Sequence, residues 1–399
     1  MYMKELVIIY NQPLSSKQGI NSVNNSFIEG QTYFNKRGIN LSNIFGSDRV
    51  HKCENSAPLA DNASPVSTKK NNRYLTLLKK IIPRNIALID AVKIYNSCYA
   101  TAKKSFKRFV ESGCDPDYII FQDPQTAELY YKNVSGKKAK TIMILHCSLS
   151  ATEQAETMWT SFFENVSLSR KFYATYEYAM SHVDMVIYLS QRAVDHSPVA
   201  PDKKTYIFNG EEDLADHAFV KSGDVINCVS VASMSWRKGH EFVLEAITKL
   251  PKEVLNKIKY HMIGAGPQMQ ELKDYVASHN LEDNVVFYGN RNDVPELLKG
   301  MDVFILPSKS EGLPMSIIEA LRQGMYLVAT DTGAIPEMIA PGCGELVERN
   351  ADQIADCLTR IVKDGTVTME VKKKAREHYL ENFTLKNMIY KYCDVLNSL

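Results

Sequence analysis

The sequence predicts an α/β protein with doubly wound parallel sheets, and three observations support that fold class. The chain has 399 residues, which is enough for two or three domains with large cores. Its hydrophobic share of 45% and charged share of 23% are those of a soluble globular protein. From about residue 225 onward, apolar runs of strand length alternate with helical segments across short turns. This alternation is typical of a doubly wound sheet, which binds ligands beyond the carboxyl ends of its strands.

In the first half, short apolar runs predict strands, and polar segments predict their connections. Residues 40–68 are rich in Asn, Ser, Asp and Pro and are predicted to be a loop. Gly19 precedes an amphipathic segment reaching Phe27, which predicts a loop that turns into a helix. Asn209-Gly210 is a turn signal, and we place a domain boundary after it. Strands are expected at residues 5–10, 117–121, 141–145, 183–190 and 205–208.

The second half is predicted in the same way. A helix is expected to begin at Lys238, and another to run from Met315 to Gln323, where Gly324 ends it. The tail from Thr368 contains two helical runs that break near residues 382–384. Strands are expected at residues 225–232, 260–263, 284–288, 302–306, 327–330 and 344–347.

The segment from Ser308 to Met338 carries the clearest functional signal. Gly312 lies in the turn between a strand and a helix, where it lets the backbone approach a ligand closely. The free amides after it and the positive end of the helix would form an anion site. Glu311 and Glu319 flank this turn, and carboxylates beside an anion site suit the binding of sugar hydroxyls. Such turns are common in α/β proteins, so spacing alone leaves a functional and a purely structural interpretation open.

The same segment resembles a known family. The pattern Glu311-x7-Glu319, preceded by a Ser and followed by EALRQG and VATDTGAIPE, resembles the signature of family-four retaining glycosyltransferases of the GT-B fold. Tyr326 departs from it, because the family often has Pro there. The resemblance is strong over residues 209–388 and patchy before them. It implies two Rossmann-like domains facing a central cleft, at residues 1–210 and 211–380, with a C-terminal helix at 381–399 that crosses back to the first.

The resemblance also implies roles for single residues. Glu311 would bind hydroxyls of the transferred sugar and Glu319 the ribose of the donor, while Lys238 would neutralise the leaving diphosphate. The family's usual Arg is Ser233 here, and we expect Arg237 to take its place. Further donor-binding residues implied are Gly19, Gly264, Asn290, Arg291, Gly312, Leu313 and Pro314.

His146 follows the strand predicted at residues 141–145. A lone His is usually structural, but the carboxyl end of a parallel strand is where such folds bind ligands. The resembling family has a His at this point, near the transferred sugar. We therefore expect His146 to belong to the catalytic site together with Glu311 and Lys238.

Composition excludes several classes of function. The net charge of +1 argues against a globally basic nucleic-acid binder. The eight cysteines form no C-x-x-C pair and are expected to be reduced thiols. No transmembrane run or signal peptide is evident, which predicts a cytoplasmic protein. Asp115-Pro116-Asp117 spells the metal triplet of another glycosyltransferase fold, but it precedes a strand instead of following one. We expect no metal and no other cofactor.

The stretch from Lys69 to Arg108 is basic, with interleaved Leu and Ile, and its single acidic residue is Asp90. It suits the inner, anionic surface of a cell membrane, and it equally suits a solvated helix packed on the core. No nucleic-acid motif accompanies the charge. Many family members act on lipid-linked acceptors through a basic N-terminal domain, which favours the membrane.

The resemblance, together with the basic stretch, implies a retaining hexosyltransferase of bacterial surface-polysaccharide or glycolipid synthesis. It would move a sugar from a UDP- or GDP-sugar to a saccharide or lipid-linked acceptor. No convincing carboxylate nucleophile is evident. The resemblance implies instead that the departing phosphate would take the acceptor's proton. The alternatives are a sugar-nucleotide epimerase of the same fold and a degenerate sugar-nucleotide-binding subunit that works only with a partner.

Overall fold

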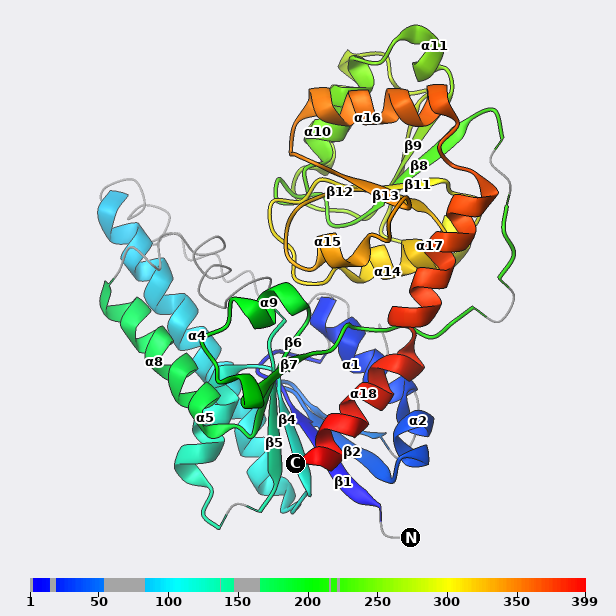
Figure 1. The fold of residues 1–399 in the computed structure, drawn as a ribbon. Helices are drawn as coiled ribbons and strands as arrows, with labels where there is room; N and C mark the ends of the chain where they lie inside the picture. Colours follow the sequence, from blue (N-terminus) through cyan, green and yellow to red (C-terminus); the bar gives the residue numbers. More distant parts are fainter. Residues whose placement is uncertain are drawn as a thin grey trace. The chain divides into compact units, whose positions relative to one another are not determined.

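A computed structural model describes residues 3–14, 19–53, 83–136, 138–146, 166–214, 217–220 and 223–399. The chain forms two compact units (Figure 1). Unit 1 contains residues 1–207 together with 389–399, and unit 2 contains residues 208–388.

Unit 1 is built on a seven-stranded sheet in the order β3-β2-β1-β4-β5-β6-β7. Neighbouring strands pair in parallel except β3, which is antiparallel to β2. The chain winds outward from β1 to β3 and then from β4 to β7, so its direction of winding changes between β1 and β4. The strands are β1 (Lys4–Ile9), β2 (Ile39–Phe45), β3 (Val50–Lys52), β4 (Tyr118–Phe121), β5 (Lys140–Ile144), β6 (Met185–Tyr188) and β7 (Lys204–Tyr206).

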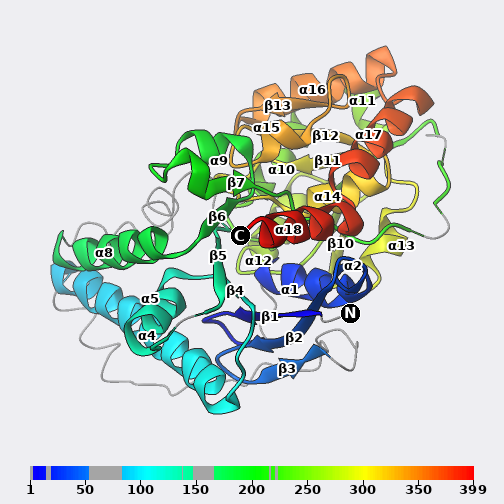
Figure 2. The same ribbon diagram turned by 60° about the horizontal axis from the view of Figure 1, so that its bottom comes forward.

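Helices cover both faces of this sheet (Figure 2). Phe109 of α4 and Tyr130 of α5 pack on one face, in a core that includes Ile9 and Phe121. Helices α1 and α2 cover the other face. Burial on both faces explains why β1 and β4 read as continuous apolar runs. The helices are α1 (Gly19–Glu29), α2 (Gln31–Lys36), α4 (Pro83–Ser112), α5 (Pro124–Asn133), α8 (Val166–His182) and α9 (Gln191–Asp195).

The loop predicted at residues 40–68 is wrong at its start, because β2 and β3 occupy residues 39–45 and 50–52. Polar residues interrupt the apolar pattern of β2, so the sequence did not indicate a strand. Ser42 lies within the strand, and its Oγ donates to the Leu6 carbonyl at 3.4 Å. The apolar side chains of β2, such as Leu41 and Ile44, are fully buried. The remainder of the predicted loop, from residue 54 onward, lies outside the described residues.

Unit 2 is a six-stranded parallel sheet in the order β10-β9-β8-β11-β12-β13. The second-half strands predicted from sequence are all present. Winding reverses between β8 and β11, and ligands of doubly wound folds bind beyond the carboxyl ends at such a point. The strands are β8 (Ile226–Val231), β9 (Ile258–Ile263), β10 (Val285–Gly289), β11 (Val303–Leu306), β12 (Tyr326–Thr330) and β13 (Gly344–Val347).

The helices of unit 2 also lie on both faces of the sheet, with α10 and α16 on one face and α14, α15 and α17 on the other (Figure 1). A core of buried residues joins α10 and α16 to alternate positions of the central strands, such as Val303 and Ile305. The helices are α10 (His240–Thr248), α11 (Lys252–Leu255), α12 (Met269–Ser278), α13 (Val294–Leu298), α14 (Met315–Arg322), α15 (Ile335–Met338), α16 (Ala351–Asp364) and α17 (Met369–Asn382).

The chain ends in α18 (Leu385–Ser398), and the break before it falls where it was predicted. From Ile389 onward, α18 belongs to unit 1. Its Tyr392 lies edge-on to Phe27 of α1, with ring centroids 5.0 Å apart. Gly30 permits this approach, since a Cβ at that position would lie 2.6 Å from Cγ1 of Ile389.

The basic stretch that we assigned to a membrane surface is only partly described. Residues 69–82 lie outside the described residues, and side chains are described only from residue 96. Beyond that point Lys103, Lys104 and Lys107 of α4 are exposed. Arg108 instead donates to the carbonyls of Ser47 at 2.6 Å and Asp48 at 3.0 Å, which ties α4 to the β2–β3 connection. In the described part of the chain, no helix has the length and apolarity that a membrane crossing requires.

Candidate functional site

The turn after β11 is fixed by neighbouring segments of unit 2. Ser308 Oγ donates to Glu311 Oε1 at 2.6 Å, and Thr330 Oγ1 at the end of β12 donates to the Ser308 carbonyl at 2.6 Å. Gly333 has φ 60°, and a Cβ there would lie 2.3 Å from the Glu311 carbonyl oxygen. The turn and the segment after β12 therefore pack backbone to backbone, which holds Glu311 at the carboxyl edge of the sheet.

Two cations from the loop after β8 meet this carboxylate. Lys238 Nζ donates to Glu311 Oε1, and Arg237 NH1 lies 3.8 Å from Glu311 Oε2. Arg237 NH1 also donates to the Ser310 carbonyl at 2.7 Å. The structure thus brings together three residues that the sequence predicted for the site. Two cations for one carboxylate leave a net positive charge there.

The loops after β8 and β11 are fastened to each other. Gly239 has φ 73°, and a Cβ there would lie 2.2 Å from the Pro307 carbonyl oxygen. The Lys309 amide donates to the Arg237 carbonyl at 2.7 Å. Because Gly239 is left-handed, α10 begins at His240, and the prediction that the helix starts at Lys238 is wrong. Lys238 lies before the helix, in the loop that contacts Glu311.

Arg349, after β13, braces both loops, and the sequence analysis missed it. Its NH2 donates to the Trp236 carbonyl at 2.6 Å, and its Nε donates to the Pro307 carbonyl at 3.2 Å. Trp236 itself is 54% exposed, and Lys309 Nζ lies 4.9 Å from its ring centroid. No local motif marks Arg349, since its partners are distant in sequence.

The remaining predicted residues of the central turn lie at the start of α14. The Gly312 carbonyl accepts a hydrogen bond from the Ala334 amide at 2.8 Å, and Leu313 is buried. Pro314 is the N-cap of α14, and no side chain caps this helix. Its first turn contains no acidic residue, so the positive helix end is not neutralised locally.

Glu319 lies in α14, and no hydrogen bond or ion pair in the described residues connects it to Glu311 or Lys238. Burial raises the pKa of Glu319 to about 8, with a further increase from the charge of Glu211 and an opposing effect from Arg322. Arg322 is itself paired with Glu211 at 3.1 Å. Glu319 Oε2 is buried and has no hydrogen-bond partner in the described structure.

The turn after β9 packs against the loop after β8. Gly264 has φ 131°, and a Cβ there would lie 2.1 Å from the Ala232 carbonyl oxygen. The Met234 amide donates to the Ala265 carbonyl at 3.1 Å. Asn290 and Arg291, after β10, are exposed, and Arg291 makes a two-point ion pair with Asp293 at 2.8 and 2.6 Å. These loops border the same carboxyl edge of the unit 2 sheet.

The other two predicted residues belong to unit 1. Gly19 is the first residue of α1, and His146 follows β5 at the carboxyl edge. Burial lowers the pKa of His146 to about 4, so its imidazole is neutral at pH 7. Its Nε2 has no hydrogen-bond partner in the described structure.

Comparison with known protein families gives a match that covers most of unit 2. Residues 213–378 match the model of the family described as glycosyl transferases group 1. Unit 2 belongs to this family. The match covers all the predicted donor-site residues except His146 and Gly19, which precede it.

Curated relatives of this group 1 glycosyl transferase domain include enzymes of bacterial surface polysaccharides. The chain is 26% identical to the Escherichia coli O-antigen biosynthesis glycosyltransferase WclY, over 54% of this chain and 62% of that protein. It is 31% identical to the putative colanic acid biosynthesis glycosyltransferase WcaL of Salmonella typhimurium, over 42% and 44%. It is 30% identical to N-acetyl-alpha-D-glucosaminyl L-malate synthase of Bacillus anthracis, over 38% and 39%. The chain therefore matches less than two thirds of the length of these relatives.

Solved structures resemble the chain over nearly its full length. The complex of Anabaena Alr3699/HepE with UDP has a TM-score of 0.64 at 16% identity and covers 100% of both chains. The lipopolysaccharide outer core galactosyltransferase WaaB has a TM-score of 0.66 at 16% identity, covering 99% of this chain and 100% of its own. Sucrose-phosphate synthase from Thermosynechococcus elongatus has a TM-score of 0.71 at 15% identity, covering 99% and 98%. These likenesses confirm the GT-B fold class with its two parallel-sheet domains.

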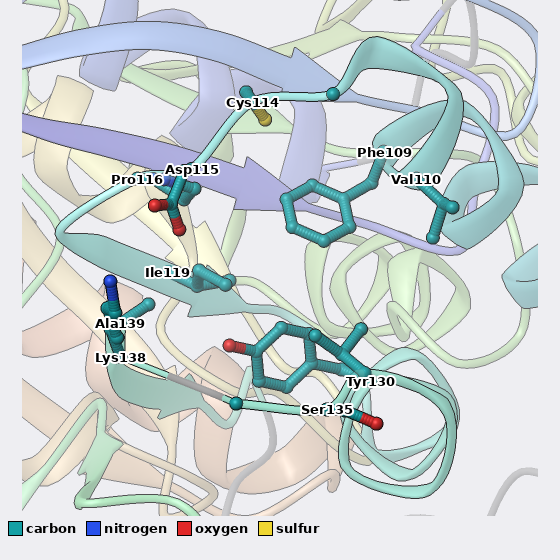
Figure 3. A pocket seen from close by; sticks show the side chains of 13 residues that line it. Phe109, Val110, Cys114, Asp115, Pro116, Ile119, Tyr130, Ser135, Lys138 and Ala139 are labelled. Carbon is teal, nitrogen blue, oxygen red and sulfur yellow. The ribbon is translucent and has the colours of Figure 1, made fainter.

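A pocket of about 230 Å³ lies away from all of these residues, at the amino ends of β4 and β5 (Figure 3). Asp115 lines it, together with Phe109, Tyr130 and Lys138. Asp117 of the same Asp-x-Asp triplet instead accepts from the Glu5 amide at 2.8 Å, which ties β4 to β1. Among the described residues, no group of three or more His, Cys, Asp or Glu side chains is placed to hold a metal ion.

Proposed function

We propose that the chain is a retaining glycosyltransferase that moves a hexose from a nucleotide-diphosphate sugar to a saccharide or lipid-linked acceptor. The observation that carries the proposal is the cluster of Lys238, Arg237 and Glu311 at the carboxyl edge of a group 1 glycosyl transferase unit. The cluster combines cations suited to a diphosphate with a carboxylate suited to sugar hydroxyls.

The donor diphosphate would be neutralised by protein groups alone. Lys238 and Arg237 supply two cations, and the uncapped N-terminus of α14 supplies free amides and a positive helix end. These groups act most strongly as negative charge develops on the departing nucleotide, which is electrostatic stabilisation of a leaving group. Arg237 would supply the positive charge that the resembling family has at the position of Ser233. We propose that no metal is required.

Glu311 is held as a hydrogen-bond acceptor. Its Oε1 accepts from Ser308 and Lys238, while Oε2 faces Arg237 at a longer distance and can accept from a sugar hydroxyl. A carboxylate engaged in this way is a poor nucleophile. We therefore propose front-face transfer, in which the acceptor oxygen bonds to the anomeric carbon as the bond from that carbon to the phosphate oxygen breaks. The departing phosphate takes the acceptor's proton.

Other residues would bind the rest of the donor. Glu319 would accept from the ribose, which would supply its unpartnered Oε2 with a hydrogen bond. Asn290 and Arg291 would face the base, and the turns at Gly264 and Gly312-Leu313-Pro314 would line the diphosphate. Gly19 and His146 would contribute from unit 1.

Relatives suggest the class of donor and acceptor. Alr3699/HepE has been solved with UDP and with UDP-glucose. An Escherichia coli relative, UDP-Gal:alpha-D-GlcNAc-diphosphoundecaprenol alpha-1,3-galactosyltransferase, is 30% identical over 34% of this chain and 35% of its own length. We propose a UDP-sugar donor, in preference to a GDP-sugar, and an acceptor of bacterial surface-polysaccharide synthesis. The exposed lysines of α4 would attract the protein to the anionic inner face of the cell membrane.

The first test is thermal stabilisation of the purified chain by UDP-, GDP- and ADP-sugars, with free nucleotides beside them. A binding donor raises the melting temperature by mass action, and we expect a UDP-sugar to give the largest increase. Lys238→Ala should abolish the increase, whereas Lys249→Ala, at an exposed ion pair with Asp352, should retain it. Donor binding without turnover on any acceptor would favour the non-catalytic subunit. Equal melting temperatures with and without every nucleotide would contradict the proposal.

A further inference from the structure

Arg237 keeps hydrogen-bond donors that the protein does not use. Its NH1 donates to the Ser310 carbonyl at 2.7 Å and lies 3.8 Å from Glu311 Oε2. Its Nε and NH2 have no partner among the described residues, and the side chain is 37% exposed. The guanidinium therefore has donors to offer an anionic ligand, and their direction depends on how the loop holds the Arg237 backbone.

The peptide groups on both sides of the Arg237 Cα are fixed by hydrogen bonds. On one side, the Arg237 carbonyl accepts from the Lys309 amide at 2.7 Å. On the other side, the Trp236 carbonyl accepts from Arg349 NH2 at 2.6 Å. Because peptide groups are planar, fixing both of them restricts the two backbone dihedrals of Arg237. These two hydrogen bonds therefore set the direction in which the Arg237 side chain leaves the loop.

The two hydrogen bonds differ in what supplies the donor. The Lys309 amide is main chain, so any residue except Pro at position 309 could provide it. The donor to Trp236 belongs to the side chain of Arg349, which also donates through Nε to the Pro307 carbonyl at 3.2 Å. A guanidinium presents several donors in one plane, and the single ammonium of a Lys does not reproduce that geometry. One side chain thus joins the loop after β8 to the turn after β11.

Arg349 is itself held in place. Its guanidinium carbon lies 4.9 Å from the ring centroid of Phe242, and its NH2 lies 3.5 Å from Glu241 Oε1. Both partners are at the start of α10, the helix that follows the loop. The next residue, Asn350, is the N-cap of α16, and its Oδ1 accepts from the Asp352 amide at 2.8 Å. Packing on one side and a helix cap on the other fix the position of the Arg349 donors.

We propose that Arg349 is a positioning residue for the donor diphosphate, acting through the Trp236 carbonyl on Arg237. This inference rests on the function proposed above, in which Arg237 binds that diphosphate. Arg349 acts without touching the donor, since its NH2 and Nε are directed at carbonyl groups. Without Arg349 the peptide group before Arg237 would be free to rotate. Its ordering would then oppose donor binding, which lowers affinity.

Two substitutions separate the hydrogen bonds of Arg349 from its charge. Arg349→Gln removes both, whereas Arg349→Lys keeps the charge and loses the planar set of donors. Both variants should fold, because the side chain is 23% exposed and the two carbonyls can accept from water instead. Arg360→Gln is the matched control, because it removes an exposed arginine of the same unit that pairs with Glu345 at 2.5 Å. Melting temperatures establish that each protein is folded.

The binding experiment is isothermal titration calorimetry of UDP with the wild type and the three variants. We expect Arg349→Gln to bind UDP roughly tenfold more weakly, as when the backbone of one residue must be ordered on binding. Arg349→Lys should be weakened by about fivefold or more, and Arg360→Gln should stay within about twofold of the wild type. A purely structural role would lower the melting temperature and leave the affinity of the folded protein unchanged.

Two results of this titration would overturn the inference. One is an Arg349→Gln variant that binds UDP as tightly as the wild type does. The other is wild-type affinity in Arg349→Lys, which would show that the charge of Arg349 matters and its hydrogen bonds do not.

Hydrogen exchange tests the positioning without any ligand. The amides of Lys238 and Lys309 report on the loop, since they donate to the carbonyls of Ser235 at 2.8 Å and Arg237 at 2.7 Å. Their exchange should be severalfold faster in both Arg349 variants than in the wild type and Arg360→Gln. Unchanged exchange would overturn the inference even if UDP bound more weakly. A wild type that binds no UDP would instead contradict the proposed function, and hydrogen exchange would then decide by itself whether Arg349 positions the loop.

Discussion

Lys238 and Glu311 form a buried ion pair although 73 residues separate them in sequence. The side chains are 13% and 7% exposed, so solvent screens the pair only weakly. Their partnership joins the loop after β8 to the turn after β11. Removal of either partner would leave the other charge buried, so the pair matters for folding as well as for the proposed donor site.

Breaking this pair should affect folding and transfer separately. Lys238→Ala leaves Glu311 buried without its closest cation, which should lower the free energy of unfolding by about 3–5 kcal/mol. It should also reduce glycosyl transfer by roughly 100-fold or more, as expected for the loss of one charge-stabilising group. Urea unfolding and initial rates would measure the two effects. The double variant Lys238→Met with Glu311→Gln should recover much of the stability and none of the activity. Recovery of both would show that the pair is only structural.

The pKa of Glu319 predicts a pH dependence of stability. Because burial raises the pKa of Glu319 to about 8, well above the usual value for Glu, the folded state favours the protonated carboxyl. Its contribution to stability is therefore fully present below the pKa of the unfolded chain, near 4.5, and declines as pH rises toward 8. Glu319→Gln should flatten the decrease in unfolding free energy between pH 5 and pH 9. The exposed Glu348→Gln should keep the wild-type profile. A Glu319→Gln profile parallel to that of the wild type would disprove this assignment.

Gly239 should be sensitive to a single added carbon. In Gly239→Ala, the new Cβ would meet the Pro307 carbonyl oxygen at 2.2 Å in addition to the strain of a left-handed φ. Gly365 offers a matched control, with φ 62° and nothing within 4 Å of a Cβ. Gly365→Ala should lower the free energy of unfolding by about 1–2 kcal/mol, the strain alone. Gly239→Ala should lower it clearly further and should also impair transfer, because Lys238 precedes it. Equal losses in the two variants would contradict the packing argument.

A second buried pair in unit 2 should matter for stability only. Lys372 of α17 donates to Asp302 Oδ1 at 2.7 Å, and the two side chains are 3% and 1% exposed. Lys372→Met would leave the Asp302 charge buried and should lower the free energy of unfolding by about 3–5 kcal/mol. Lys374→Met, in the same helix, removes an exposed pair with Glu370 and should leave the free energy of unfolding nearly unchanged. Chemical denaturation of both variants measures the difference. Similar losses of unfolding free energy would show that the buried pair contributes no more to stability than the exposed pair.

Much of the fold could be predicted because strands buried on both faces produce continuous apolar runs that are visible locally. All six strands of unit 2 were predicted for this reason. The break before α18 was predicted from the interruption between two helical runs near residues 382–384. Strand β2 was missed because Asn40, Ser42 and Asn43 interrupt its apolar residues. The start of α10 was misplaced because the left-handed conformation of Gly239 depends on the Pro307 carbonyl, which is distant in sequence.

The sequence by itself determined the α/β class and the glycosyltransferase family of unit 2, and it predicted Glu311 and Lys238 as site residues, since each of these rests on a local pattern. Only the tertiary structure decided that Lys238 and Arg237 share one carboxylate and that Arg349 braces their loop. These relationships join segments that approach one another only when parallel strands align their carboxyl ends. A hydrogen bond or ion pair between such segments depends on sheet order and register, which no short stretch of sequence specifies.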